Sequence, residues 1–573
     1  MRARAEEQID EAVPHGERLA FFAAVGQQPL TRQGRIRYAQ ALFEAGRRAE
    51  AAEMLRQSWV LDDFPRSEGE YFLGLYREYL RAADHEQRLS RLLWDGEVTA
   101  AQRMLPLVRK DLQLLATARI RLQGLEKKAD AALEAVPAAL RADPGLLYDR
   151  LRWARRRGQR AEAVAVLLRT PQDLVRPELW WPEQHRVIRD LLDAGAADRA
   201  YQVAKVHQHR EGVPFAEAEW LAGWIALRFL KDPAAARQHF VRLSAGVTTQ
   251  ISRGRAGYWA GRAAEQAGDR AGAREWYRRA SAHPSTFYGQ LAAQKATVRL
   301  PALVPLRARA TEGARERLRR RESAAVAAAL CRLDGGEADA ALPFFRHLGH
   351  EAADDPDELR AVAELAAECG RPDLVVIAAK AAAKEGAEPD PNTAFPVPAV
   401  RGFRAEDRSL PDPALRIAIA RQESQFDHRV GSPAGALGMM QLMPATAKAV
   451  CERLGLPYSK TRLVRDAEYN VRLGSTYIKG QLDNYDGEAV LALAAYNAGP
   501  GRVAQWLREN GDPRGGSAER LVDWVEMIPF AETRNYVQRV VEAREVYKVL
   551  LARERPPAAA AATAATTIAR PAS

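Results

Sequence analysis

Cysteine is scarce in this sequence, with three residues among 573. Cys331, Cys369 and Cys451 are widely spaced, and no neighbouring His or Cys completes a set of metal ligands around any of them. An odd number of cysteines in this arrangement argues against a disulfide framework and against a zinc site. We therefore expect neither a disulfide framework nor a bound metal, and no cofactor.

Long apolar segments are also missing. The sequence contains no run of about eighteen apolar residues, the length that a membrane-spanning helix requires. We therefore expect no transmembrane segment. The first eight residues are charged from the start, and the apolar stretch 19–25 lies too late and is too short for the core of a signal peptide. No export signal is visible, and the cysteines leave the redox compartment undetermined.

Acidic residues are outnumbered by basic ones. There are 85 Lys and Arg against 74 Asp and Glu, which gives a formal net charge of +11 and an isoelectric point near 9.6. Such a balance favours an anionic partner, and nucleic acid and a carboxylate-bearing cell-wall polymer both meet that description. The basic residues are spread along the chain without a nucleic-acid recognition motif, so nucleic acid is the less favoured of the two.

The first two thirds of the chain are predicted to be a helical-repeat region. From about residue 30 to residue 385 the sequence reads as helices rich in Ala, Leu and Arg, separated by glycine turns. Small residues recur where paired helices would pack closely, as in a tetratricopeptide-like solenoid with drifting spacing. The predicted turns contain Gly46, Gly158, Gly195, Gly268, Gly336 and Gly370.

A proline-rich stretch ends this pattern. Residues 389–398 contain four prolines, which cannot continue a helix. We expect a repeat region over 1–385, a connection over 386–411 and a separate helical domain over 412–555. Residues 556–573 are an Ala-rich tract with little apolar surface to bury, so we expect a disordered tail.

One carboxylate in the third segment stands on an apolar helix face. Leu415 and Ile419 recur at helical spacing, and Glu423 follows Ile419 by four residues on the same face. Burial disfavours the ionised carboxylate and raises its pKa, as a general acid near neutral pH needs. An isolated Glu is more often a helix-surface residue. Here the neighbouring motifs favour catalysis.

Several sequence blocks around Glu423 carry a resemblance to a known family. They are ARQES (420–424) with GALGMMQLMP (435–444), NVRLGSTY (470–477), AAYNAGPGRV (494–503) and EMIPFAETRNYV (526–537). In this order they resemble the catalytic domain of the soluble lytic transglycosylases, which are relatives of goose-type lysozyme. The resemblance implies an all-α protein in which an α-superhelical, tetratricopeptide-like solenoid precedes a lysozyme-like domain. It also implies a periplasmic location.

The resemblance implies a peptidoglycan lytic transglycosylase. In that family one Glu protonates the leaving sugar oxygen and then takes a proton from the C6 hydroxyl of N-acetylmuramic acid, which closes a 1,6-anhydro ring without water. Glu423 matches this residue. No second catalytic carboxylate is evident, since Asp427 is interpreted as structural or at the rim. An intramolecular nucleophile makes a water-activating base unnecessary.

Tyr496 and Asn497 are also indicated by local pattern. Gly499 ends the apolar helix 488–497, so both side chains are expected in its last turn. In the family, Tyr496 matches the tyrosine beside the catalytic carboxyl. We expect Glu423 and Tyr496 to be catalytic. By the same resemblance, the residues expected to bind the glycan are Ser432, Gln441, Met443, Asn497 and Glu526.

Two other functions stay open from the sequence. One is a hydrolytic muramidase on the same domain, and the other is a non-catalytic scaffold that grips glycan while its repeats bind a protein. The intact Glu423, Gln441 and Tyr496 argue against the scaffold.

Residues 483–487 faintly resemble a calcium loop but lack its alternating ligands, so no metal is expected. The expected partners are glycan strands and, at the repeats, cell-wall proteins.

Overall fold

The protein is described here from a computed structural model, which covers residues 2–554 except 11, 25–27, 127–128, 171–173, 305–307, 332, 334–338, 388–390 and 405–408. The predicted tail (556–573), the turn at Gly336 and parts of the predicted connection lie outside the described residues. Within the described part the secondary structure is helical, without β-strands. Isolated bridges pair Leu437 with Gly431 and with Leu442. The all-α prediction is confirmed.

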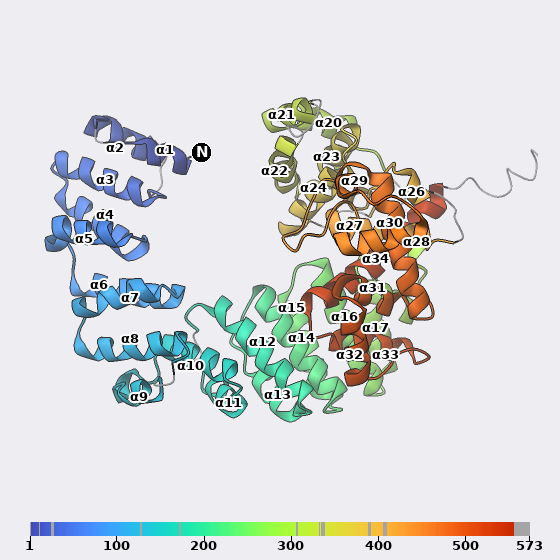
Figure 1. The fold of residues 1–573 in the computed structure, drawn as a ribbon, viewed down its shortest axis with the longest axis horizontal. Coiled ribbons are helices and arrows are strands. Elements are labelled where there is room, and N and C mark those ends of the chain that lie inside the picture. Colours follow the sequence, from blue (N-terminus) through green and yellow to red (C-terminus); the bar gives the residue numbers. More distant parts are fainter. Residues whose placement is uncertain are drawn as a thin grey trace, which may run out of the picture. The chain divides into compact units, whose positions relative to one another are not determined.

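The chain forms two compact units, Met1–Arg210 and Glu211–Ser573 (Figure 1). The α-helices of the first unit are α1 (Arg2–Gln8), α2 (His15–Ala24), α3 (Arg32–Glu44), α4 (Arg48–Leu61), α5 (Arg66–Tyr76), α6 (Ala82–Asp95), α7 (Val98–Met104), α8 (Lys110–Gln123), α9 (Ala129–Glu134), α10 (Pro144–Arg156), α11 (Arg160–Leu168), α12 (Pro177–Asp193) and α13 (Ala197–Lys205).

The second unit begins with further repeat helices and continues into the helices that carry the motifs. Its repeat helices are α14 (Gly212–Arg228), α15 (Pro233–Gly246), α16 (Gln250–Gln266), α17 (Arg270–Ser281), α18 (Phe287–Lys295), α19 (Leu300–Leu303), α20 (Glu312–Arg319), α21 (Glu322–Cys331), α22 (Leu342–Glu351), α23 (Pro356–Glu368) and α24 (Pro372–Lys384). The remaining helices are α25 (Pro391–Ala394), α26 (Arg401–Arg404), α27 (Pro413–Ser424), α28 (Pro444–Leu454), α29 (Lys460–Arg465), α30 (Ala467–Asn484), α31 (Ala489–Ala498), α32 (Pro500–Asn510), α33 (Ala518–Met527) and α34 (Ala531–Glu554).

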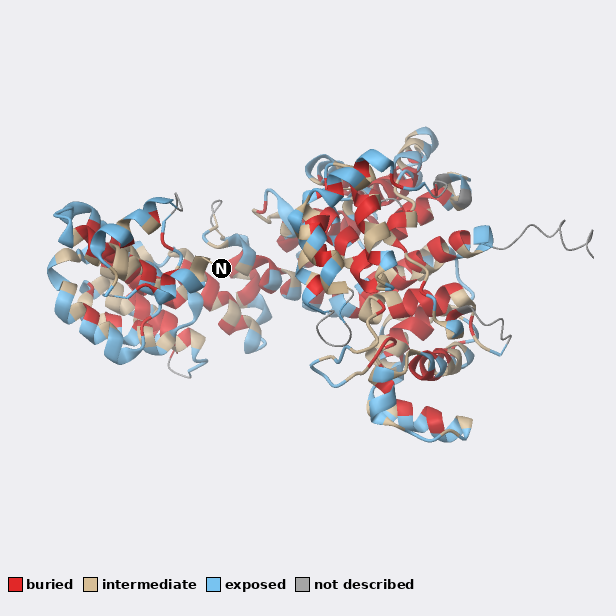
Figure 2. Cartoon of the chain, turned by 90° about the horizontal axis from the view of Figure 1, so that it is seen from above, coloured by how far each residue is buried: buried red, intermediate tan, exposed pale blue. Residues whose placement is uncertain are grey.

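Glycine turns join consecutive repeat helices, as the sequence predicted. At these turns the backbone has a positive φ of between 66° and 81°, which only glycine adopts without a steric penalty. The residues are Gly46, Gly158, Gly195, Gly268 and Gly370. Pairs such as α3 with α4 and α16 with α17 pack directly on each other. Buried residues gather on the facing sides of the helices (Figure 2).

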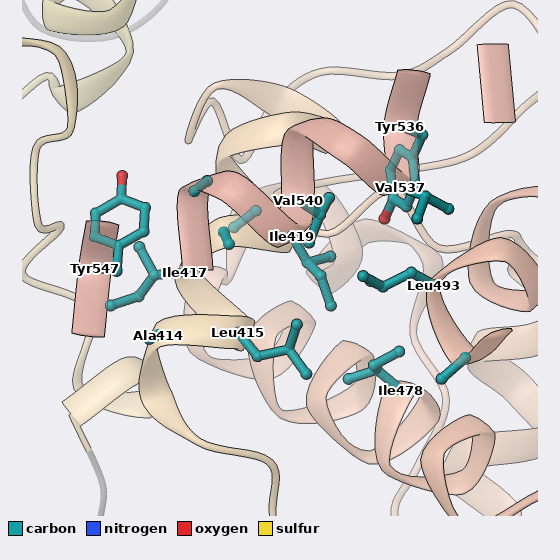
Figure 3. Packing of buried hydrophobic residues seen from close by; sticks show 14 of the residues in the cluster. Ala414, Leu415, Ile417, Ile419, Ile478, Leu493, Tyr536, Val537, Val540 and Tyr547 are labelled. Carbon is teal, nitrogen blue, oxygen red and sulfur yellow. The ribbon is translucent and has the colours of Figure 1, made fainter. Parts of the chain in front are cut away.

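The motif-bearing helix α27 is held by apolar packing. Its Ile417 and Ile419 are fully buried, and α27 packs along α34, where Val537 and Val540 are also fully buried (Figure 3). Leu493 of α31 belongs to the same cluster. Each buried aliphatic side chain contributes about 1.5–3 kcal/mol relative to exposure, so the backbone that carries Glu423 is firmly placed.

A buried carboxylate on α33 joins the motif helices to the repeat helices. Glu526 is fully buried and accepts hydrogen bonds from the Tyr288 hydroxyl of α18 and, at 2.7 Å, from Gln538 of α34. Arg255 of α16 donates to it at 3.3 Å, and Arg534 lies 3.6 Å away. These contacts supply the charge and hydrogen bonds that a buried carboxylate requires.

A second buried carboxylate, on α34, also joins the motif helices to the repeat helices. Glu542 is 5% exposed, accepts the backbone N–H of Phe287 at 2.7 Å and pairs with Arg539 at 2.9 Å. Its own carbonyl oxygen accepts the Gln290 side chain at 2.9 Å. Burial raises the pKa of Glu542 to about 7. Residues 412–554 therefore share a compact unit with α16 and α18, and the predicted domain borders at 386 and 412 stay a prediction.

The structure corrects the expectation from the cysteines. Cys331, at the end of α21, and Cys369, just after α23, form a disulfide whose Cα atoms lie 5.5 Å apart. The pair was missed because 38 residues of sequence separate two helix ends that packing brings together. Cys451 is free and buried, and its thiol lies 3.1 Å from the Tyr469 hydroxyl.

We expect this disulfide to stabilise the second unit measurably. Replacing both Cys331 and Cys369 by Ala should lower the free energy of unfolding by up to about 4 kcal/mol, since the bond closes a long loop in the unfolded chain. Urea unfolding of the two proteins measures this. Reductant should shift the midpoint of the wild type and leave that of the double variant unchanged. Equal midpoints without reductant would contradict the expectation.

None of the helices within the described ranges combines the length and the apolar composition needed to cross a membrane.

Candidate active site

The helix that ends at the candidate acid is fixed at both ends. Asp412 caps the start of α27 by accepting the backbone N–H of Leu415 at 2.9 Å. After Ser424 the backbone takes positive φ values at Gln425 (55°) and Phe426 (75°), two non-glycine residues in a row. Backbone strain of this kind is tolerated where packing enforces it and is frequent at functional sites.

Ser424 stabilises that turn. Its hydroxyl donates to the carbonyl of Met439 at 2.8 Å and accepts the backbone N–H of Phe426 at 3.1 Å. The first contact ties the end of α27 to the loop that carries the Met-rich motif. The position of Glu423, one residue earlier, is thereby fixed relative to this loop.

Glu423 is partly buried at the end of α27. Burial is the main cause that raises the pKa of its carboxyl to about 7, and the negative charge of Glu532 raises it further. Attraction to the Tyr536 hydroxyl acts in the opposite direction. The raised pKa expected from the apolar helix face is confirmed, and a carboxyl with this pKa is about half protonated at pH 7 and largely protonated below pH 6.

Tyr496 lies in the last turn of α31, as the sequence predicted. Its hydroxyl donates to the carbonyl of Met440 at 2.7 Å, and its ring packs on Tyr477 with centroids 5.1 Å apart. Burial and the charge of Glu423 raise the pKa of Tyr496, which shows that the hydroxyl and the carboxyl are electrostatic neighbours. The two residues expected to be catalytic are brought together.

Two residues beside Glu423 were missed by sequence reasoning. Tyr536, 4% exposed on α34, directs its hydroxyl at Glu423 yet has no partner with full hydrogen-bond geometry among the described residues. Glu532 is exposed in the first turn of α34. Both belong to the block 526–537, so that block contained the signal. Their proximity to Glu423 arises only when α34 packs along α27.

The loop between α27 and α28 holds three of the expected glycan-binding residues. Ser432 closes a tight turn, with its Oγ accepting the backbone N–H of Ala436 at 3.0 Å. Gln441 has a positive φ of 46°, and its amide donates to the carbonyls of Val430 at 3.0 Å and Gly438 at 2.9 Å. The amide hydrogens of Gln441 therefore maintain the shape of the loop.

Gly438 in this loop cannot be replaced without rearrangement. It has a φ of 80°, and a Cβ there would lie 2.0 Å from the carbonyl oxygen of Leu463.

Met443 and Asn497 are two further residues expected to bind glycan. Met443, which is 44% exposed, precedes α28 and is available for contact. Asn497 follows Tyr496, and its side-chain oxygen accepts the Thr533 hydroxyl at 2.7 Å. That bond joins α31 to α34.

The structure places Glu526 differently from the expected cleft position. Its carboxylate has no exposed surface, and its hydrogen bonds go to the repeat helices and α34, as described above. A sugar therefore has no surface of this residue to contact. Asp427, interpreted as structural, pairs with Arg429 at 3.0 Å, and the pKa of Asp427 is lowered.

Comparison with known proteins identifies the segment around this site. Residues 403–516 match the family model for the transglycosylase SLT domain. The soluble lytic murein transglycosylase of Escherichia coli K12 is 41% identical over 138 residues, which are 24% of this chain and 20% of that protein. A putative soluble lytic murein transglycosylase of Haemophilus influenzae is 39% identical over 140 residues, 24% of this chain and 23% of that protein.

Solved structures share the fold over much more of the chain. A lytic transglycosylase Slt from Pseudomonas aeruginosa superposes with a TM-score of 0.69 and 24% identity, covering 93% of this chain and 84% of that one. The 70-kDa soluble lytic transglycosylase from Escherichia coli superposes with a TM-score of 0.68 and 20% identity, covering 96% of this chain and 85% of that one. The sequence matches span only about a fifth of the curated relatives. The resemblance drawn from the motifs is confirmed, and it is carried by residues 403–516, which match the SLT domain model.

Proposed function

We propose that this protein, through its SLT domain, is a peptidoglycan lytic transglycosylase that cleaves the β-1,4 bond between N-acetylmuramic acid and N-acetylglucosamine without water. The observation that carries the proposal is the carboxyl of Glu423, whose pKa of about 7 suits one group to act as acid and then as base. A scaffold that only grips glycan has no use for such a group.

The proposed reaction uses Glu423 twice. First its proton passes to the leaving O4 of N-acetylglucosamine as the bond from C1 of the muramoyl residue to that oxygen breaks. The 2-acetamido oxygen of the substrate shields the positive charge that develops at C1. The carboxylate then takes the proton of the C6 hydroxyl, O6 bonds to C1, and a 1,6-anhydro end forms. The group returns to its protonated state, so the atoms balance without water.

The tyrosines around Glu423 have positioning roles in this proposal. Tyr496 is fixed by its bond to the Met440 carbonyl, and Tyr536 presents a buried hydroxyl that lacks a partner of full geometry. An unsatisfied buried hydroxyl is costly unless something binds it. We assign Tyr536 to hold the Glu423 carboxyl and the approaching substrate oxygen in line.

Glu532 supports a second candidate, a hydrolytic muramidase. Its exposed carboxylate lies close enough to Glu423 to raise that residue's pKa, and a second carboxylate is what hydrolysis needs to activate water. Mass spectrometry of products from purified peptidoglycan separates the two. Anhydro-ended fragments support the transglycosylase, whereas reducing ends, heavier by one water, support the muramidase. In the proposed reaction, Glu532→Gln still yields anhydro ends.

The rate of cleavage should fall as the pH rises through about 7, because the first step needs protonated Glu423. Two variants should move this falling limb in opposite directions. Tyr536→Phe removes an interaction that lowers the pKa of Glu423, so the limb moves to higher pH. Glu532→Gln removes a repulsion, so the limb moves to lower pH. Initial rates from pH 4 to 9 measure both shifts, and shifts in the same direction would refute this assignment.

We also propose a periplasmic location. Disulfides persist in oxidising compartments, and the Cys331 to Cys369 bond fits such a setting. The curated relatives are named for murein, a polymer outside the cytoplasmic membrane. We also propose that the repeat helices bind other cell-wall proteins.

A further inference from the structure

The first unit contains a cavity of about 520 Å³ that is lined by residues of four helices, α4, α5, α6 and α7. Trp59 and Phe64 form an apolar wall, and Arg66, Glu70, Arg88 and Arg103 supply its charges. We propose that this cavity binds the terminal carboxylate of a peptide stem on a peptidoglycan strand. The inference rests on the proposed function for the identity of the strand, and on the cavity's own chemistry for the carboxylate.

Arg88 is the central group of this cavity. It is 4% exposed, and its guanidinium lies 4.3 Å from the centroid of the Trp59 ring and 5.0 Å from that of Phe64. Its Nη1 donates to the carbonyls of Trp59 and, at 2.8 Å, of Asp62. In the part of the chain that the structure describes, these are its only hydrogen bonds, and no carboxylate forms an ion pair with it.

The nearest carboxylates are engaged by other arginines. Asp62 binds Arg35, with one hydrogen bond of 2.8 Å, and Asp63 pairs with Arg91 at 3.0 Å. Burial lowers the pKa of Arg88 to about 10, and the positive charges of Arg91 and Arg103 act in the same direction, while the negative charges of Asp63 and Asp62 offset part of the shift. A buried cation without an anionic partner is costly, so an incoming anion gains the energy of neutralising it.

Arg103 adds a second uncompensated charge. It is exposed on α7 and forms no ion pair or hydrogen bond with any described residue. Glu70 is the acidic group on the cavity wall, and Arg66 pairs with it at 2.9 Å. Three arginines against one glutamate leave the lining with a net charge of +2, which favours an anion.

The apolar wall distinguishes the kind of anion. Trp59 and Phe64 are buried and back this wall, while Leu73, which is partly exposed, offers surface for a small apolar group beside the charges. A free phosphate would leave this surface unused. An alanine carboxylate, as at the end of a peptide stem, places a methyl group next to the anion and uses both features.

Binding of a free stem tests the proposal without involving cleavage. The probes are an alanine-terminated tetrapeptide stem freed of its sugars, its C-terminal amide, and inorganic phosphate, titrated calorimetrically into the full-length protein. We expect the free acid to bind at least about tenfold more tightly than the amide or phosphate, a difference of about 1.4 kcal/mol. Equal binding of the acid and amide, or of the acid and phosphate, would overturn the proposal.

Variants locate the site. Arg88→Gln and Arg103→Gln should each weaken the tetrapeptide at least about tenfold, and Arg103 is exposed, so its variant remains informative if Arg88→Gln fails to fold. Arg47→Gln is the matched control, because Arg47 is an exposed arginine of the same unit that pairs with Glu50. An Arg103→Gln protein that binds the tetrapeptide as well as wild type overturns the site. Cleavage of stem-free glycan by this variant should equal that of wild type, which separates this site from the active site.

Discussion

Glu423→Gln is expected to lower turnover of peptidoglycan strands by at least about three orders of magnitude, because acid and base steps, each typically worth 10²–10⁴-fold, share this one group. The amide keeps the shape of the side chain but has no proton to give. Binding of glycan strands should therefore persist. The measurement is the release of soluble muropeptides by full-length wild type and variant.

The same substitution has a predictable effect on stability. Folding raises the pKa of Glu423 from 4.5 to about 7 because burial penalises the ionised carboxyl, so the folded protein is favoured most below pH 4.5 and loses that stability as the pH rises through 7. An amide does not titrate. The unfolding midpoint of Glu423→Gln relative to wild type should thus rise between pH 4 and 7 and stay constant above.

The activity of the same variant tests the assignment of the acid. A folded Glu423→Gln protein that keeps more than about a tenth of wild-type activity would show that another group is the acid.

Glu526→Ala should destabilise the second unit by about 3–5 kcal/mol, because it leaves the buried Arg534 and the partly buried Arg255 without their shared carboxylate. Urea unfolding measures the loss. Glu519→Gln is the matched control. Glu519 also lies on α33 and pairs with Lys295 of α18, but it is 30% exposed, so its loss should cost at most about 1 kcal/mol.

Equal losses in the two variants would show that burial of Glu526 does not determine its role. If Glu526 instead bound glycan in the cleft, the result would differ. Glu526→Ala would then weaken the binding of glycan strands and leave the unfolding midpoint near that of wild type. The two readouts together decide between the expected cleft residue and the buried junction that the structure shows.

The sequence predicted what local pattern controls. The apolar face of α27, the turn glycines and the helix end after Tyr496 each depend on residues within a few positions of one another, and each is confirmed. The position of Glu423 on a partly buried face followed from the same spacing, and so did the upward shift of its pKa.

Features that depend on packing between distant segments were not predicted. Tyr536 and Glu532 reach Glu423 only because α34 lies along α27, more than a hundred residues later in the chain. The partners of Glu526 on α16 and α18 are farther still along the sequence. The Cys331 to Cys369 bond likewise joins ends of separate helices. Periodicity contains no information about which faces meet.

The buried junction also constrains the order in which the proposed site can be completed as the chain is made. Ribosomes extend chains from the N-terminus, so Arg255, Tyr288 and the backbone N–H of Phe287 are made long before Glu526 and Glu542 emerge to pair with them. The same late helix, α34, brings Tyr536 to Glu423. An unfinished chain therefore contains Glu423 without its surroundings, and the proposed active site is complete only with the last described helix.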